Sequence, residues 1–223
     1  MTRLPRLLVV GDLVSDIRIV PQQPVALGEE VEGLISMSGG GSAANQAGWL
    51  AHLGADVTFV GRIGADVVGA ALVEELERSG VKVVAVTDPL YSSGTVACLI
   101  SDSGERSLIT SRGANRRLEA SDVSEECWSV EMLVLTGYSF SSVESTPAAR
   151  AFMAEASRRE LPVALDPASA RLFMAYPGAA RFRAWTAGAR WLFPSSTEAR
   201  ALAGCASDST AASELLRTYG GVV

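Results

Sequence analysis

The chain has 223 residues, of which 48% are hydrophobic and 20% charged, the composition of a soluble globular protein with an ample core. Its net charge of −6 argues against nucleic acid or an anionic membrane as a main partner. No apolar run approaches the ~18 residues that a membrane-spanning helix needs. Residues 1–16 hold too few consecutive apolar side chains for the core of a signal peptide.

The few cysteine and histidine residues limit which kinds of catalytic and metal site the chain can form. The three cysteines, Cys98, Cys127 and Cys205, are odd in number and widely spaced, which indicates reduced thiols in a cytosolic protein. The single histidine, His52, belongs to an apolar segment, so neither histidine-based general base catalysis nor a histidine-rich metal site is expected. We therefore expect a cytoplasmic protein.

The first half of the chain predicts a buried strand and then amphipathic strands outside the core. The apolar run at 7–10 ends in Gly-Asp, which is typical of a buried parallel strand followed by a turn. Residues 17–20 and 30–37 alternate between apolar and polar side chains, and residues 92–112 predict a hairpin around Asp102-Ser103-Gly104-Glu105. The individual elements expected here are strands at 17–20, 30–37, 57–60, 81–86, 95–100 and 107–110, and helices at 43–53 and 67–79.

From about residue 130, strand and helix patterns alternate, which predicts βαβ units and a parallel sheet with helices on both faces. The strand groups at 14–38 and 92–112 would form a small sheet beside this core. A last strand begins at 222–223, and a sheet that stopped there would have an unpaired edge. We therefore expect residues 1–223 to form a single domain, incomplete at its C-terminus. The remaining elements expected are strands at 132–135, 163–165 and 191–193, and helices at 147–159, 197–203 and 207–219.

The most informative segment is Gly39 to Gly69, GGGSAANQAGWLAHLGADVTFVGRIGADVVG. Consecutive glycines let the backbone approach a ligand closely and point free N–H groups at it. Asn45 follows them and can both donate and accept hydrogen bonds, which suits a sugar hydroxyl. A Gly-rich turn that opens a buried helix without any ligand is the alternative.

The spacing of Gly40, Gly41, Asn45, Gly54 and Gly64 resembles the N-terminal signature of the ribokinase/PfkB family of ATP-dependent carbohydrate and nucleoside kinases. The resemblance implies a three-layer, doubly wound α/β fold with a mainly parallel sheet and a small β-sheet lid over the sugar site. It implies ATP-dependent phosphorylation of a sugar or nucleoside hydroxyl, with Mg²⁺ as the second cofactor. It also implies a homodimer through the lid.

The same resemblance implies that Asp16, Gly40, Gly41 and Asn45 contact the substrate. Asp12 and Asp16 follow the first strand, and ligands of open α/β sheets collect at the carboxyl ends of strands. Asp12 could instead cap a turn, and Asp16 could be a solvated loop acid. In the same pattern Asp66 opens a helix and caps its N-terminus.

Two further residues match the family's substrate side. Arg106 falls on the second lid strand, where a guanidinium could clamp a carboxylate or phosphate, although a surface arginine in a hairpin would look the same. Tyr138 follows the strand that ends at Leu135 and could stack on a sugar ring or belong to the core. Asn115 resembles a family element that shapes a turn.

The nucleotide side of the family corresponds to Asp166, Ser195 and Glu198. Glu198 matches the glutamate of an N-x-x-E motif that organises Mg²⁺ through water, with Ser195 in place of the usual Asn. The alternative is that Ser195 caps a helix and Glu198 lies in its first turn.

The family's catalytic base lies in a Gly-Ala-Gly-Asp element that does not occur in these residues. We therefore expect no catalytic residue in this chain, a base Asp beyond Val223, and no kinase activity from the 223 residues alone. A catalytically inactive carbohydrate-binding or regulatory protein is the alternative function. The identity of the sugar or nucleoside stays open.

Overall fold

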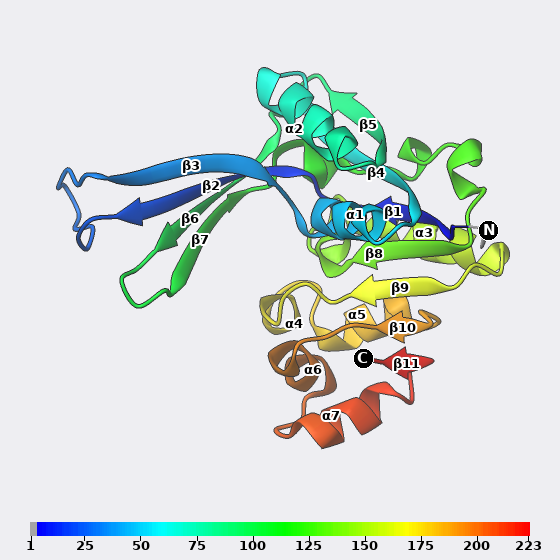
Figure 1. The fold of residues 1–223 in the computed structure, drawn as a ribbon. Coiled ribbons are helices and arrows are strands. Elements are labelled where there is room, and N and C mark those ends of the chain that lie inside the picture. The colour runs from blue at the N-terminus through cyan, green and yellow to red at the C-terminus, as the bar shows by residue number, and fades with distance from the viewer. Residues whose placement is uncertain (1–3) are drawn as a thin grey trace.

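A computed structural model describes residues 4–223 and places a seven-stranded parallel sheet at the centre of the molecule (Figure 1). Residues 1–3, which open the segment considered as a signal peptide, lie outside the described residues. The strand order is β11-β10-β9-β8-β1-β4-β5. The strands are β1 (Arg6–Val10), β4 (Asp56–Gly64), β5 (Lys82–Asp88), β8 (Met132–Thr136), β9 (Val163–Asp166), β10 (Trp191–Leu192) and β11 (Gly221–Val222).

Side chains alternate across the sheet and build one hydrophobic cluster on each face. Leu7 and Val9 of β1 pack with α1 and α2, whereas Leu8 and Val10 pack with the helices of the second half of the chain. This is the three-layer, doubly wound arrangement expected from the sequence, and strands buried on both faces explain the continuous apolar run of β1. The helices are α1 (Ser42–His52), α2 (Val67–Arg78), α3 (Thr146–Arg158), α4 (Arg171–Met174), α5 (Ala179–Thr186), α6 (Ser196–Ala203) and α7 (Asp208–Leu215).

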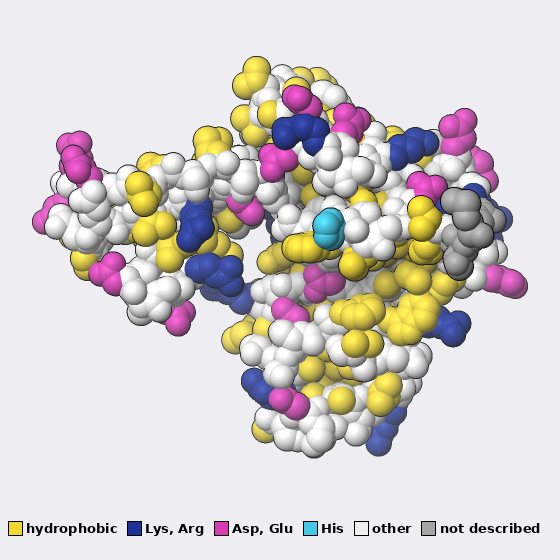
Figure 2. Space-filling view, viewed as in Figure 1, with side chains coloured by type: hydrophobic (Ala, Val, Ile, Leu, Met, Phe, Trp, Pro, Cys, Tyr) yellow, Lys and Arg dark blue, Asp and Glu magenta, His cyan; other side chains and the backbone are white. Residues whose placement is uncertain are grey.

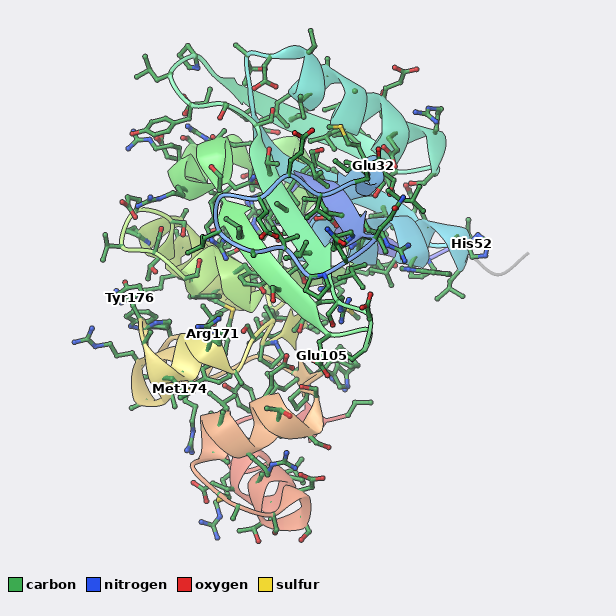
Figure 3. All side chains as sticks on the ribbon, turned by 90° about the vertical axis from the view of Figure 1, so that its left-hand side faces the viewer. Glu32, His52, Glu105, Arg171, Met174 and Tyr176 are labelled. Carbon is green, nitrogen blue, oxygen red and sulfur yellow. The ribbon has the colours of Figure 1, made fainter. Side chains whose placement is uncertain are left out.

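A second sheet of four strands, here called the lid, extends from the core as a separate arm (Figure 1). Its strand order is β3-β2-β6-β7, with β2 and β6 parallel and the outer pairs antiparallel. Figure 3 looks along the lid toward the core and labels Glu105, which lies in the turn between β6 and β7. The lid sheet predicted from two separate strand groups is confirmed. Its strands are β2 (Val14–Pro21), β3 (Gly33–Gly40), β6 (Gly94–Ile100) and β7 (Arg106–Ser111).

Several boundaries differ from the sequence predictions. The strand expected at 30–37 is β3, Gly33–Gly40, because the terminal glycines stay extended by pairing with β2. Helices α4 and α5 were not predicted, and α7 ends at Leu215 instead of continuing to residue 219. None of the helices between residues 4 and 223 is long and apolar enough to cross a membrane.

Candidate functional site

A cavity of about 600 Å³ lies between the lid and the core. The inner face of the lid forms one wall, and the carboxyl ends of β1 and β8 with the start of α1 form the other. Figure 2 shows the gap between the two parts of the molecule. The cavity brings together six residues predicted to bind substrate: Asp12, Asp16, Gly41, Asn45, Arg106 and Tyr138.

Gly40, the seventh predicted residue, makes room for the carboxylate of Asp16. A methyl group placed on residue 40 would lie 2.1 Å from Oδ2 of Asp16, far inside contact distance. Asp16 lies within β2 and opposite Ser38 of β3, so it is a lid-strand residue and not a loop acid. Its carboxylate accepts no hydrogen bond from any described residue, which leaves its oxygens available to a ligand.

Burial raises the pKa of Asp16 above its usual value, and the nearby charge of Asp12 raises it further. Asp12 itself accepts hydrogen bonds from the backbone N–H groups of Ser42 and Ala43, at 2.9 and 3.2 Å, at the start of α1. Gly41 permits this close approach because its φ is +106° and a methyl group there would lie 2.5 Å from the Asp12 carbonyl oxygen. Asp12 therefore caps the helix and also lines the cavity.

Tyr138 forms the floor of the cavity together with Arg112. The Arg112 guanidinium carbon lies 4.6 Å from the Tyr138 ring centroid, and its NH1 donates to the Tyr138 carbonyl at 3.2 Å. Burial raises the pKa of the Tyr138 hydroxyl. The charges of Asp12, Asp166 and Glu198 raise it further, and Arg112 opposes the shift.

Sequence reasoning missed two arginines of the cavity, Arg18 and Arg112. Arg18 lies two residues after Asp16, and the period of a strand alone places both side chains on one face. Arg112 follows the hairpin, and no local pattern distinguishes it from a surface residue. Asn115 holds the turn after β1, because its amide pairs with the backbone N–H and C=O of Leu13, both at 3.0 Å.

The residues predicted for the nucleotide side lie further along the same edge of the sheet. Asp166 ends β9, and Ser195 and Glu198 follow β10. Because β1, β8, β9 and β10 are consecutive and parallel, their carboxyl ends form one row, from Asp12 past Tyr138 to Glu198. None of the three nucleotide-side residues lines the lid cavity.

Asp166 is tied to α1, since it accepts hydrogen bonds from the Ser42 hydroxyl at 2.8 Å and the Gln46 amide at 3.0 Å. Ser195 and Glu198 form a capping box at the start of α6. Oε2 of Glu198 accepts from the Ser195 N–H at 2.8 Å, and the Ser195 hydroxyl accepts from the Glu198 N–H at 3.4 Å. Residues 4–223 contain no group of three or more His, Cys, Asp or Glu side chains that could hold a metal directly.

A model of the pfkB family carbohydrate kinases matches residues 5–220. The chain belongs to this family. Ribokinase of Bacillus subtilis is 31% identical over 108 residues, a match that covers 48% of this chain. The matched part is 37% of the length of that ribokinase, so the match covers well under half of this relative.

Solved structures share the PfkB-type fold along nearly the whole chain. Fructokinase with bound ATP from Xylella fastidiosa superposes with a TM-score of 0.80 at 21% identity, covering 99% of this chain and 72% of the fructokinase. Adenosine kinase from Sinorhizobium meliloti superposes with a TM-score of 0.85 at 20% identity, covering 99% of this chain and 75% of the other. At these identities the likeness establishes the fold, ribokinase-like with a lid.

Proposed function

We propose that these residues bind a sugar or nucleoside in the lid cavity of a PfkB-type kinase, which transfers the γ-phosphoryl group of ATP to one of its hydroxyls. The observation that carries this proposal is the free carboxylate of Asp16, which faces a cavity also lined by Asn45. A carboxylate accepts hydrogen bonds from sugar hydroxyls, and an amide both donates and accepts. Because the chain spans only part of its relatives, phosphoryl transfer is proposed for the whole protein, acting in the cytoplasm.

The row formed by the carboxyl ends of β1, β8, β9 and β10 supports a site with a sugar side and a nucleotide side. The sugar lies at the carboxyl end of β1, and ATP is proposed to lie near Asp166, Ser195 and Glu198 at the ends of β9 and β10. In the transfer, a bond forms between the sugar oxygen and the γ-phosphorus while the bond from phosphorus to the ADP oxygen breaks. A base must also take the proton of the sugar hydroxyl, and we assign this role to none of the 223 residues.

The side chains on the nucleotide side, Asp166, Ser195 and Glu198, could hold Mg²⁺ only through water molecules of its hydration shell. One Glu198 oxygen is engaged in the capping box, which leaves the other for a water molecule of the ion's shell. Mg²⁺ would supply charge neutralisation of the ATP phosphates when bound. Glu198 and Ser195 would orient that water from the start of α6, where the helix dipole also favours negative phosphate.

Isothermal titration with a panel of sugars and nucleosides tests the sugar site. We expect wild-type protein to bind at least one member, Asp16→Asn to weaken it at least tenfold, and Asn45→Ala to weaken it less. Asp102→Asn is the matched control, because this acid lies in the lid turn and does not line the cavity. Equal binding by the wild type and the Asp16 variant would overturn the proposed site.

The alternative, a carbohydrate-binding protein without catalysis, differs in its response to nucleotide. A kinase site places the two ligands along one sheet edge, so a non-hydrolysable ATP analogue with Mg²⁺ is expected to change sugar affinity. Sugar binding that is indifferent to the analogue would favour the binding-protein function.

We also propose a homodimer through the outer face of the lid, the face turned away from the cavity. Period-two alternation leaves this face apolar, and Ile35, Met37 and Ile109 are 68%, 63% and 76% exposed. A second copy would cover them. Light scattering is expected to give a dimer mass for the wild type and a monomer mass for Ile109→Lys, and a monomeric wild type would contradict the proposal. The apolar residues of the outer face are Ile17, Ile19, Ile35, Met37, Ala97, Leu99 and Ile109.

A further inference from the structure

Three guanidinium groups line the lid cavity, those of Arg18, Arg106 and Arg112. Arg18 pairs with Cys98, and Arg106 with Ile100, and all four of these lid residues line the cavity. Both lid arginines therefore lie on the inner face of the lid. Arg18 lies one inner-face position further from the core than Asp16, and Arg106 lies two such positions further. Basic side chains gather on the lid beside the gap in Figure 2.

None of these arginines forms an ion pair with a carboxylate among the described residues. Among residues 4–223, the Arg112 guanidinium contacts only the carbonyl oxygen and the ring of Tyr138. Burial lowers the pKa of Arg112 below its usual value, and the neighbouring charge of Asp12 only partly offsets this. Arg112 is thus a desolvated cation that lacks a paired counter-charge.

The two acids of the cavity do not balance the three cations. Asp12 is already engaged by the backbone N–H groups that begin α1. Asp16 is the remaining acid, and among the described residues it forms no ion pair with any of the three arginines. The cavity therefore has an excess of positive charge in a protein whose net charge is −6.

We infer that the substrate of this cavity carries an oxyanion, a carboxylate or a phosphate, held by Arg18 and Arg106 at the outer end of the lid. The inference rests on the proposed function and specifies its substrate class. A planar guanidinium donates two parallel hydrogen bonds to a carboxylate or phosphate, which a neutral sugar cannot accept in the same way. Asp16 repels an anion, so the sugar hydroxyls face Asp16 and the oxyanion faces the arginines.

The experiment compares matched ligands by isothermal titration in phosphate-free buffer of low ionic strength. Each neutral sugar, such as D-ribose, D-fructose or D-glucose, is paired with its phosphate monoester and its sugar acid. The variants are Arg18→Gln, Arg106→Gln and the double substitution, and Arg181→Gln on α5 is the control away from the cavity. Arg18 and Arg106 are exposed, so thermal unfolding of the variants is expected to match that of the wild type.

In the wild type, an anionic ligand is expected to bind at least tenfold more tightly than its neutral counterpart. Each single substitution should reduce this preference by about tenfold, the double substitution should remove it, and the control should keep it. A preference for only the acid or only the phosphate identifies the source of the oxyanion. Neutral sugars that bind as tightly as their anionic counterparts overturn the inference and leave the proposed function standing. Failure of every ligand in the panel overturns both.

Discussion

Replacement of Arg62 tests how the core holds the segments that shape the cavity. Its guanidinium donates to both carboxylate oxygens of Asp122, at 2.7 and 2.8 Å, and reaches Asp88 at 3.4 Å. The side chains of Arg62, Asp122 and Asp88 are only 11%, 3% and 6% exposed. Arg62→Met would leave two buried carboxylates without their counter-charge, because no other described cation pairs with either of them.

Removing one partner from a buried ion pair costs about 3–5 kcal/mol. For a domain of this size each kcal/mol lowers the melting temperature by about 2–4 °C, so the variant should melt roughly 6–20 °C lower. Adding Asp88→Asn and Asp122→Asn to Arg62→Met should recover part of the loss, since the uncompensated charges disappear.

The assay is urea denaturation with thermal unfolding as a second readout. Arg78→Met is the matched control, because Arg78 and its partner Glu74 are 68% and 74% exposed and such surface pairs contribute little. A loss below 1 kcal/mol for Arg62→Met, equal to that of the control, would refute the reasoning. A triple variant no more stable than the single one would refute the explanation by unpaired charge.

Two further predictions concern the glycine-rich segment. Gly40→Ala forces its methyl group against the Asp16 carboxylate, so sugar affinity should fall at least tenfold by titration. Gly48→Ala in α1, whose added methyl meets only ordinary contact at 3.5 Å, should bind as the wild type does, and equal affinity for both variants would contradict the steric explanation. The Asp66 carboxylate accepts from the Ser93 N–H, the Ser93 hydroxyl and the Gly69 N–H, at 2.8, 2.7 and 2.8 Å, and these bonds hold its pKa below the usual 3.8. Its contribution to stability is therefore complete well above pH 3.8 and is lost as pH falls through the lowered pKa. Asp66→Asn should lower the free energy of unfolding at pH 7 and make it depend less on pH below about 4. An Asp66→Asn variant whose stability falls with acid as steeply as that of the wild type would contradict this.

The parts of the fold that follow local rules could be predicted from the sequence. Asp66 precedes an apolar helical run by one residue and caps α2, as its position indicates. The apolar run of β1 and the alternation along β2 likewise identified a buried strand and a lid strand. These signals need only neighbouring residues, because hydrophobic periodicity and capping act within a few positions.

The cavity could be predicted only in part, because pairing between distant segments creates its inner wall. β2 pairs with β6, and this places Arg18 beside Cys98, a relation that neither segment contains alone. The strands β10 and β11 are two residues long and owe their existence to neighbouring strands, so propensity could not fix their bounds. The sequence predicts Gly40 as a substrate contact, whereas in the structure Gly40 makes room for the Asp16 carboxylate and does not line the lid cavity.

A crystal structure of the protein with the tightest-binding member of the sugar panel tests the central proposal most directly. The proposal predicts a ligand in the lid cavity, with hydroxyls within hydrogen-bond distance of the Asp16 carboxylate and the Asn45 amide. A ligand bound elsewhere, for instance in the apolar pocket lined by Trp49, Met132 and Phe193, would contradict it.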